Sequence, residues 1–214
     1  GGITIPEASM PTVRSLSSAV TVGSAGAEDT KLVFDGNAQD FHIGLDDSED
    51  KLTIGLGSTL GTTSHMTFDS TGAILKPLQP AFLAFATTVS NLPIDITHTV
   101  EFGTEVYDQN GDFSSDTFTA PITGRYLLTA NFYSNTIVNN ANYFWFYIQT
   151  SNRTYSSIVD PGTFDENSSY HNLHVSAVAD MDASDTAKVR YVQNGGSASS
   201  DLGGGTFFSG CLLA

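Results

Sequence analysis

The five histidines are the side chains best suited to acid–base or metal chemistry, and their spacing argues against both. His171 and His174 are three residues apart, so on a β-strand their rings point to opposite faces and cannot share a metal ion. His42, His65 and His98 stand alone, and the chain has no nucleophile-elbow, phosphate-loop or zinc-protease motif. We therefore expect no catalytic residues and no metal site. A depolymerase that uses two carboxylates far apart in sequence stays open as an alternative, because such pairs leave no local pattern.

The segment Asp108–Asp112 (DQNGD) alternates oxygen-bearing side chains like the start of a calcium-binding loop. Such a loop needs glycine at its sixth position and a carboxylate at its twelfth, where this chain has Phe113 and Thr119. Asn110-Gly111 instead favours a tight hairpin turn. We predict a polar turn and no cofactor, and calcium stays open without a ligand set to name.

The charge balance excludes two classes of partner. Lys and Arg total 8 against 23 Asp and Glu, a net charge of −15, and the cations are scattered singly. Nucleic acid and anionic membrane surfaces both need clustered cations, so neither is expected as a partner. No apolar stretch reaches the roughly 18 residues of a membrane span, so membrane insertion is not expected either. Cys211 is the single cysteine, and we expect it on a buried strand, as a small hydrophobic residue.

The polar residues just described must be held by β-structure. Charged residues make up only 14% of the chain, and strand-forming residues abound where helix formers are scarce. Two prolines, Pro77 and Pro80, mark a boundary. We predict an extended lead-in at residues 1–30 with a short strand near residues 19–22, a β-stem at 31–78, and a ten-stranded sandwich or jelly roll at 79–214.

The predicted stem cannot stand alone. Its four short runs are KLVFD, DFHIGLD, DKLTIGLG and SHMTFD. In the second and third runs apolar residues alternate, at Phe41, Ile43 and Leu45 and at Leu52, Ile54 and Leu56, which is typical of strands with one buried face. Four such short strands form one thin sheet with no second layer, and so small a sheet is unstable in water. We expect other copies of the same segment to cover the apolar face, with three sheets around an axis. The alternative is that these strands extend the C-terminal sandwich.

The run Tyr143–Ile148 is apolar on both of its faces. Alternation separates Tyr143, Trp145 and Tyr147 from Phe144, Phe146 and Ile148. In a two-sheet sandwich only one face enters the core, so we expect a partner chain on the other. The residues predicted for the trimer interface or core are Phe82, Phe85, Tyr143, Phe144, Trp145, Phe146, Tyr147, Phe207 and Phe208.

Three long polar segments, at residues 135–142, 160–169 and 195–205, are the candidate recognition loops, because loops on a rigid sandwich often carry binding. Their Asn, Ser, Gly and aromatic residues suit a cell-surface glycan; the alternative is that they are plain connectors. The candidate ligand-binding residues are Asn139, Asn140, Tyr155, Phe164, Asp165 and Tyr170, with the three aromatic rings expected to be exposed.

Residues 79–214 resemble the C1q-like (C1q/TNF-like) globular domain. The resemblance lies in PAFLAF at 80–85, in the series Phe118, Ala120, Pro121, Gly124 and Tyr126, and in Phe208-Ser-Gly-Cys-Leu-Leu213. It implies a ten-stranded jelly roll that forms tight homotrimers and binds partners through exposed loops.

The upstream text KLVFDGNAQDFHIGLDDSEDKLTIGLGS and TFDSTGAI resembles the β-stems of bacteriophage tail fibres and other virion fibres, and no collagen repeat is present. Together the two resemblances imply a virion fibre, on tail or capsid, that adheres to a host receptor. Because the chain begins with Gly1 rather than Met, we also expect an attachment region upstream that meets other virion proteins. The alternative is a secreted bacterial or invertebrate C1q-like binding protein.

Overall fold

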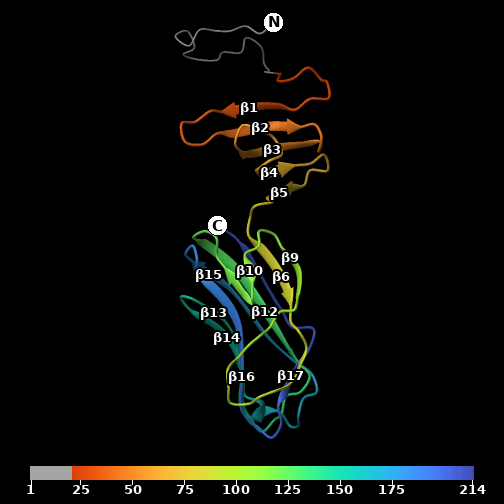
Figure 1. Cartoon of the computed structure of the whole chain (residues 1–214). Coiled ribbons are helices and arrows are strands. Elements are labelled where there is room, and N and C mark those ends of the chain that lie inside the picture. Colours follow the sequence, from red (N-terminus) through yellow and green to blue (C-terminus); the bar gives the residue numbers. More distant parts are fainter. Residues whose placement is uncertain (1–20) are drawn as a thin grey trace. The chain divides into compact units, whose positions relative to one another are not determined.

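The computed structural model describes residues 21–214 (Figure 1). Contacts divide the chain into unit 1, residues 1–77, and unit 2, residues 78–214. The described part is almost entirely β-structure, with one 3₁₀ turn, η2, at Pro161–Thr163, which confirms the all-β prediction. The short strand predicted near residues 19–22 begins outside the described residues, and Thr21 and Val22 are not in a strand.

Unit 1 is one antiparallel meander whose strands pair in chain order. Its strands are β1 (Thr30–Phe34), β2 (Phe41–Asp46), β3 (Lys51–Leu56), β4 (Ser64–Phe68) and β5 (Ile74–Leu75). The first four are the four predicted runs. The strand register pairs apolar residues with apolar residues: Ile43 lies between Leu32 and Ile54, and Leu45 pairs with Leu52. Apolar side chains therefore gather on one face of the sheet.

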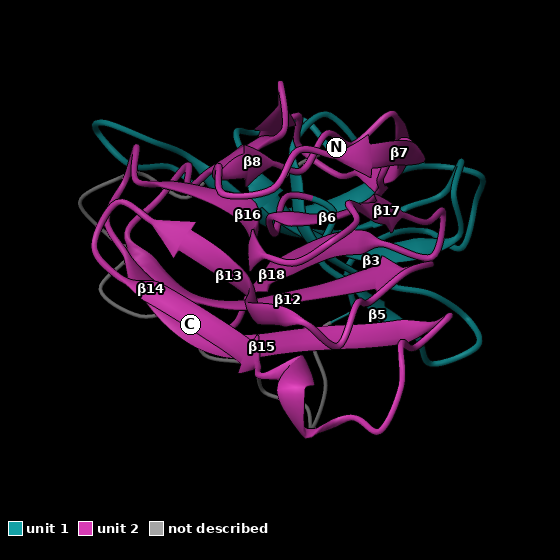
Figure 2. Ribbon diagram, turned by 90° about the horizontal axis from the view of Figure 1, so that it is seen from below, with its two compact units in different colours: residues 1–77 teal, residues 78–214 magenta. Residues whose placement is uncertain are grey.

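Unit 2 is a sandwich of two antiparallel sheets with jelly-roll strand order (Figure 2). The β12 sheet contains β6 (Ala81–Phe85), β7 (Val89–Leu92), β9 (Thr104–Asp108), β12 (Gly124–Ser134), β15 (His171–Met181), β17 (Ser200–Leu202) and β18 (Phe207–Leu212). The β13 sheet contains β8 (His98–Thr99), β10 (Phe113–Ser114), β11 (Thr117–Thr119), β13 (Ala141–Thr150), β14 (Thr154–Val159) and β16 (Thr186–Gly195).

The inner faces of the two sheets form one core. Phe132 of β12 stacks on Tyr191 of β16, with ring centroids 4.1 Å apart, and Phe82 contacts Phe113, Phe118 and Phe208 at 4.9 Å each. These rings are fully or almost fully buried. Unit 2 therefore builds an aromatic core from the residues of one chain.

Residues that carry the family resemblance have packing roles. The hydroxyl of buried Tyr126 donates a hydrogen bond to the Ile122 carbonyl at 2.7 Å. A Cβ on Gly210 would lie 2.7 Å from the Phe82 ring, and one on Gly124 would lie 2.7 Å from Leu212. Glycine at both positions is therefore required by close packing rather than by chemistry.

Candidate interaction sites

The sheet of unit 1 has an apolar face that the rest of the unit leaves exposed. Its apolar face consists of Leu32, Phe34, Phe41, Ile43, Leu45, Leu52, Ile54, Leu56, Met66, Phe68 and Ile74. Seven of these side chains are 37–57% exposed: Leu32, Phe34, Phe41, Ile43, Leu45, Leu52 and Ile74. Those seven alone offer about 600 Å² of apolar surface, at the upper end of what a typical monomer exposes in one patch.

Over β2 and β3, the opposite face of the same sheet is polar, rich in glycine and buried. His42, Asp46 and Thr53 are at most 7% exposed. The segment after β3 crosses them: Gly57 donates to the Asp40 carbonyl at 2.8 Å, and its own carbonyl accepts from Nδ1 of His42 at 2.8 Å. Unit 1 thus hides its polar face and leaves its apolar face open, which reverses the usual arrangement of a half-buried sheet.

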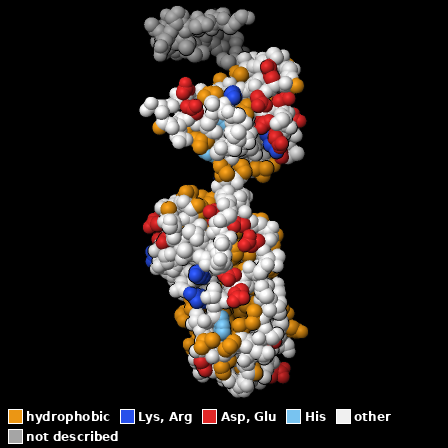
Figure 3. All heavy atoms as spheres, in the orientation of Figure 1, with side chains coloured by type: hydrophobic (Ala, Val, Ile, Leu, Met, Phe, Trp, Pro, Cys, Tyr) orange, Lys and Arg blue, Asp and Glu red, His pale blue; other side chains and the backbone are white. Residues whose placement is uncertain are grey.

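The outer face of the β12 sheet in unit 2 is also apolar in part. Register brings Val178, Leu127, Cys211 and Ala81 into one row, and Phe207 lies beside Phe85 with ring centroids 6.0 Å apart. Val178 and Leu127 are exposed, and Ala81 and Cys211 are half-buried. Cys211 therefore lies half-buried on an outer face, and the prediction that it lies on a buried strand is wrong. Figure 3 shows hydrophobic side chains at the surface of both units.

The aromatic residues predicted for the interface or core separate into three places. Phe82, Phe144, Phe146 and Phe208 lie in the core of the single chain, and Phe85 and Phe207 lie on the outer face of the β12 sheet. Tyr143, Trp145 and Tyr147 lie on the outer face of the β13 sheet, where the rings of Trp145 and Tyr147 are 4.4 Å apart. Tyr147 is already 92% buried there and the other two are half-buried, so this face needs less cover from a partner than the sequence indicated.

The three candidate recognition loops meet at one end of unit 2. An isolated bridge joins Ile137 to Ser168 through two hydrogen bonds of 2.9 Å, and Asn167 accepts from the backbone of Asn139. The carboxamide oxygen of Asn140 accepts from both the backbone and the hydroxyl of Ser197. Segments that are far apart in sequence therefore form one surface, which we call the loop end.

The loop end lies far from the point where the chain enters unit 2. Gln79 donates to the Leu212 carbonyl at 2.6 Å, and Arg125 donates to that of Ala214. Strand β12 spans eleven residues from this end to Ser134 at the loop end, about 35 Å at the usual rise per residue. The loops are thus presented at the end of the sandwich opposite to the entry of the chain.

The predicted ligand-binding residues occupy different environments. Asn139, Asn140, Phe164, Asp165 and Tyr170 belong to the loop end. Tyr155 does not, because it lies on β14 opposite Ile148 and packs against the core. Of the three rings expected to be exposed, only Tyr170 is, at 68%; it stacks on Tyr133. Tyr155 and Phe164 are half-buried.

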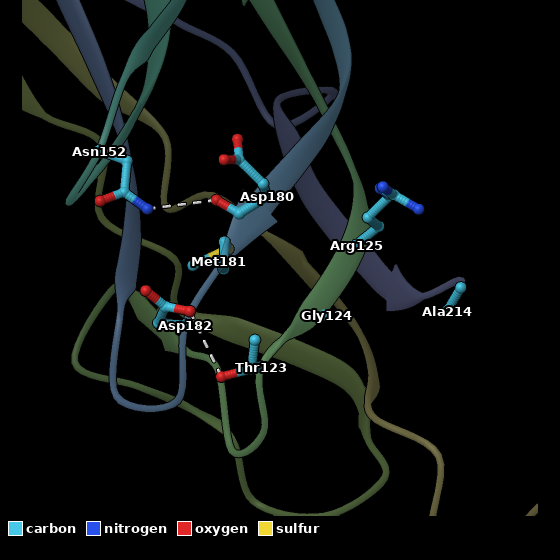
Figure 4. Close-up of a pocket in the computed structure, with 8 residues that line it drawn as sticks. All are labelled: Thr123, Gly124, Arg125, Asn152, Asp180, Met181, Asp182 and Ala214. Carbon is cyan, nitrogen blue, oxygen red and sulfur yellow. Dashed lines mark hydrogen bonds between the residues drawn. The ribbon is translucent and has the colours of Figure 1, made fainter.

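A hollow of about 290 Å³ lies at the end of unit 2 where the chain enters it, opposite to the loop end (Figure 4). Its polar groups largely bind one another: the Asn152 amide donates to the Asp180 carbonyl and to Asp185, and Thr123 donates to Asp182. Arg153 pairs with Asp180 at 3.2 Å and lowers the pKa of that carboxyl group. Because its donors and acceptors are paired, this hollow is a weaker candidate than the loop end.

The remaining groups singled out for chemistry have structural roles. Both carboxylate oxygens of Asp108 accept backbone N–H groups, from Asp112 at 3.0 Å and from Phe113 at 2.9 Å. This fixes a polar turn at Gly111, whose φ is +74°. The flanking strands β9 and β10 pair with β6 and β11, in different sheets, so the prediction of a polar turn is confirmed and the prediction that it closes a hairpin is wrong. His171 and His174 point to opposite faces of β15. Within residues 21–214, no group of three or more His, Cys, Asp or Glu side chains is placed to hold a metal ion.

Among the same residues, no helix is long and apolar enough to cross a membrane.

No protein-family model matches the chain, and no curated protein sequence matches it. Among solved structures, the globular domain of a zebrafish complement 1qA protein aligns with 64% of this chain and 98% of its own length, at 16% identity and a TM-score of 0.47. Murine APRIL aligns over 63% and 99%, at 14% identity and a TM-score of 0.46. Eiger TNF from S. frugiperda aligns over 64% and 93%, at 13% identity and a TM-score of 0.45.

Proposed function

We propose that this chain is a homotrimeric virion fibre protein in which unit 1 forms a self-associating stem and unit 2 adheres to a host-cell surface. The observation that carries the proposal is the reversed burial of unit 1, whose apolar face is open while its polar face is covered. Such a sheet is stable only when something apolar packs on it, and identical copies of the same face supply that cover.

The energetics favour self-association strongly. About 600 Å² of open apolar surface corresponds to about 15 kcal/mol per chain at 25 cal/mol per Å². Ordering and desolvation on association consume much of this gross figure. The surface is close to the roughly 800 Å² per partner of a standard stable interface before half-buried Ile54, Leu56, Met66 and Phe68 are included.

Unit 2 supports the same assembly through a separate surface. The row from Val178 to Ala81 and the adjacent Phe207 and Phe85 give the β12 sheet an apolar outer face of its own. The number three rests on the resemblance of residues 79–214 to C1q-like domains. Three copies of the loop end, each at the far end of its sandwich, bind a surface with high avidity even when each single contact is weak.

The virion role rests on the resemblance of the stem sequence to phage and other virion fibre stems, and on the short-stranded meander that this sequence forms. Sedimentation of the purified chain over a dilution series, together with immunogold labelling of particles with an antibody to unit 2, tests both parts. We expect a trimer and labelled fibre tips. A stable folded monomer at micromolar concentration would overturn the assembly, and unlabelled particles would overturn the virion role.

A further inference from the structure

We infer that the hollow at the loop end binds a neutral saccharide, an inference that rests on the proposed adhesive function and specifies its ligand class. The hollow has a volume of about 620 Å³ and is lined by Phe164, Asp165, Glu166, Asn167, Ser168, Ser169 and His171. This volume suits a ligand of one to a few sugar rings.

The floor of the hollow is a pair of rings. Phe164 packs against the core of unit 2, and its centroid lies 5.6 Å from that of His171, which is half-buried at the start of β15. Sugar rings present C–H groups that pack on aromatic faces, so one apolar ring among polar side chains is a suitable base for a saccharide.

The backbone that carries these side chains is fixed in place. The Asp160 carboxylate accepts from Gly162 at 2.9 Å, and the N–H of Phe164 donates to the Pro161 carbonyl at 2.9 Å, which closes η2. The bridge between Ser168 and Ile137 ties the far side of the loop to the neighbouring loop. Binding therefore requires little ordering of the loop, which favours affinity for a small ligand.

The rim of the hollow carries hydrogen-bonding groups that are free to meet a ligand. Among residues 21–214, the carboxylates of Asp165 and Glu166 have no hydrogen-bond or ion-pair partner, and both side chains are exposed. Carboxylates accept hydrogen bonds from hydroxyl groups, and bonds to a charged acceptor are stronger than neutral ones. Vicinal sugar hydroxyls are donors of the matching kind.

Charge selects against acidic sugars. The three loops, residues 135–142, 160–169 and 195–205, contain Asp160, Asp165, Glu166 and Asp201 and not one Lys or Arg. An anionic saccharide such as a uronate or a phosphorylated glycan would meet like charge without a counter-cation, which is unfavourable. A ligand with hydroxyl groups and no net charge fits both the ring floor and the acidic rim.

The experiment measures binding of immobilised hexasaccharides to the full chain by biolayer interferometry. The neutral probes are gluco-, galacto- and manno-hexaose, and the anionic probes are oligoalginate and oligogalacturonate. The test variant is Asp165→Ala with Glu166→Ala; a second is Phe164→Leu, with its melting temperature checked. Glu101→Ala with Glu105→Ala is the matched control, because it removes two exposed carboxylates from unit 2 outside the three loops.

We expect at least one neutral hexaose to bind when a calcium chelator is present, and we expect its affinity to depend little on salt concentration. Affinity should fall about tenfold or more in the test variants and stay unchanged in the control. The inference is overturned if no neutral probe binds, if only the anionic probes bind, if a calcium chelator abolishes binding, or if both test variants bind like the wild type. If one of these results is obtained while the trimer is intact and still adheres to host cells, only the saccharide inference fails and the proposed function stands. If the chain does not form a trimer, the proposed function is overturned instead.

Discussion

Truncating Ile43 tests whether the apolar face of unit 1 is an interface. Ile43 lies at the centre of that face, between Leu32 and Ile54, and is 37% exposed in the single chain. Its matched control is Val33, a neighbouring β-branched residue that is 40% exposed on the opposite face of the sheet. We predict that Ile43→Ala weakens assembly and that Val33→Ala does not.

The magnitude follows from the exposed area. At 37% exposure Ile43 presents about 60 Å², which on burial contributes about 1.5 kcal/mol per chain. A trimer loses this three times, about 4.5 kcal/mol, so its dissociation constant should rise about 10³-fold. Ile43→Asp should be more severe, because each chain would bury an unpaired carboxylate in the assembly.

Analytical ultracentrifugation of wild type and variants over a wide dilution range measures the dissociation constant directly. Circular dichroism at high concentration verifies that each variant folds. Equal dissociation constants for Ile43→Ala and Val33→Ala would refute the reasoning, because side chains of similar exposure would then matter equally on the apolar face and on the opposite face.

Three other predictions concern unit 2. Phe208→Ala removes a fully buried ring that contacts Phe82 at 4.9 Å, and should lower the free energy of unfolding by about 3–5 kcal/mol in a denaturant titration. Gly210→Ala places a Cβ 2.7 Å from Phe82 and 2.8 Å from Leu128, and should lower that free energy by about 1–3 kcal/mol; an unchanged midpoint would show that the ring moves freely. Burial, followed by the charge of Asp108, raises the pKa of Asp112 above its ordinary value of 3.8. Ionised Asp112 therefore destabilises the fold once the pH exceeds that value. Asp112→Asn should raise the melting temperature at neutral pH and leave it unchanged below pH 3.8. A shift of the same size at both pH values would argue against this account.

Local pattern was sufficient for most strands. The alternation of Phe41, Ile43 and Leu45 predicts β2 and its apolar face, because side-chain direction on a strand depends only on position. Strands β5, β9 and β17 were not predicted, and β7 was not separated from β6. β5 has only two residues, and β17 begins at Ser200 within a segment rich in Gly and Ser. What makes these segments strands is pairing with β4, β6 and β7, which local sequence does not encode.

The interaction sites were less accessible from sequence. The sequence predicts that the loops carry polar residues. It does not predict that they lie together, because this depends on the strand order, which places Ile137 beside Ser168 and Asn140 beside Ser197. Tyr155 was grouped with the candidate ligand-binding residues as an exposed ring, yet its pairing with Ile148 directs it to the core. The outer face of the β13 sheet appeared more open than it is, because contact between the Trp145 and Tyr147 rings was not foreseeable.

The distance between the loop end and the point of chain entry has a practical consequence for this scaffold. Segments 135–142, 160–169 and 195–205 are joined to one another by hydrogen bonds at the loop end, whereas Ile43 and Leu127 lie on sheet faces outside these segments. In the proposed assembly, loops of different sequence can therefore be grafted at the loop end without changing the sheet faces through which the copies would join. A label added after Ala214 would leave the tip unobstructed for display.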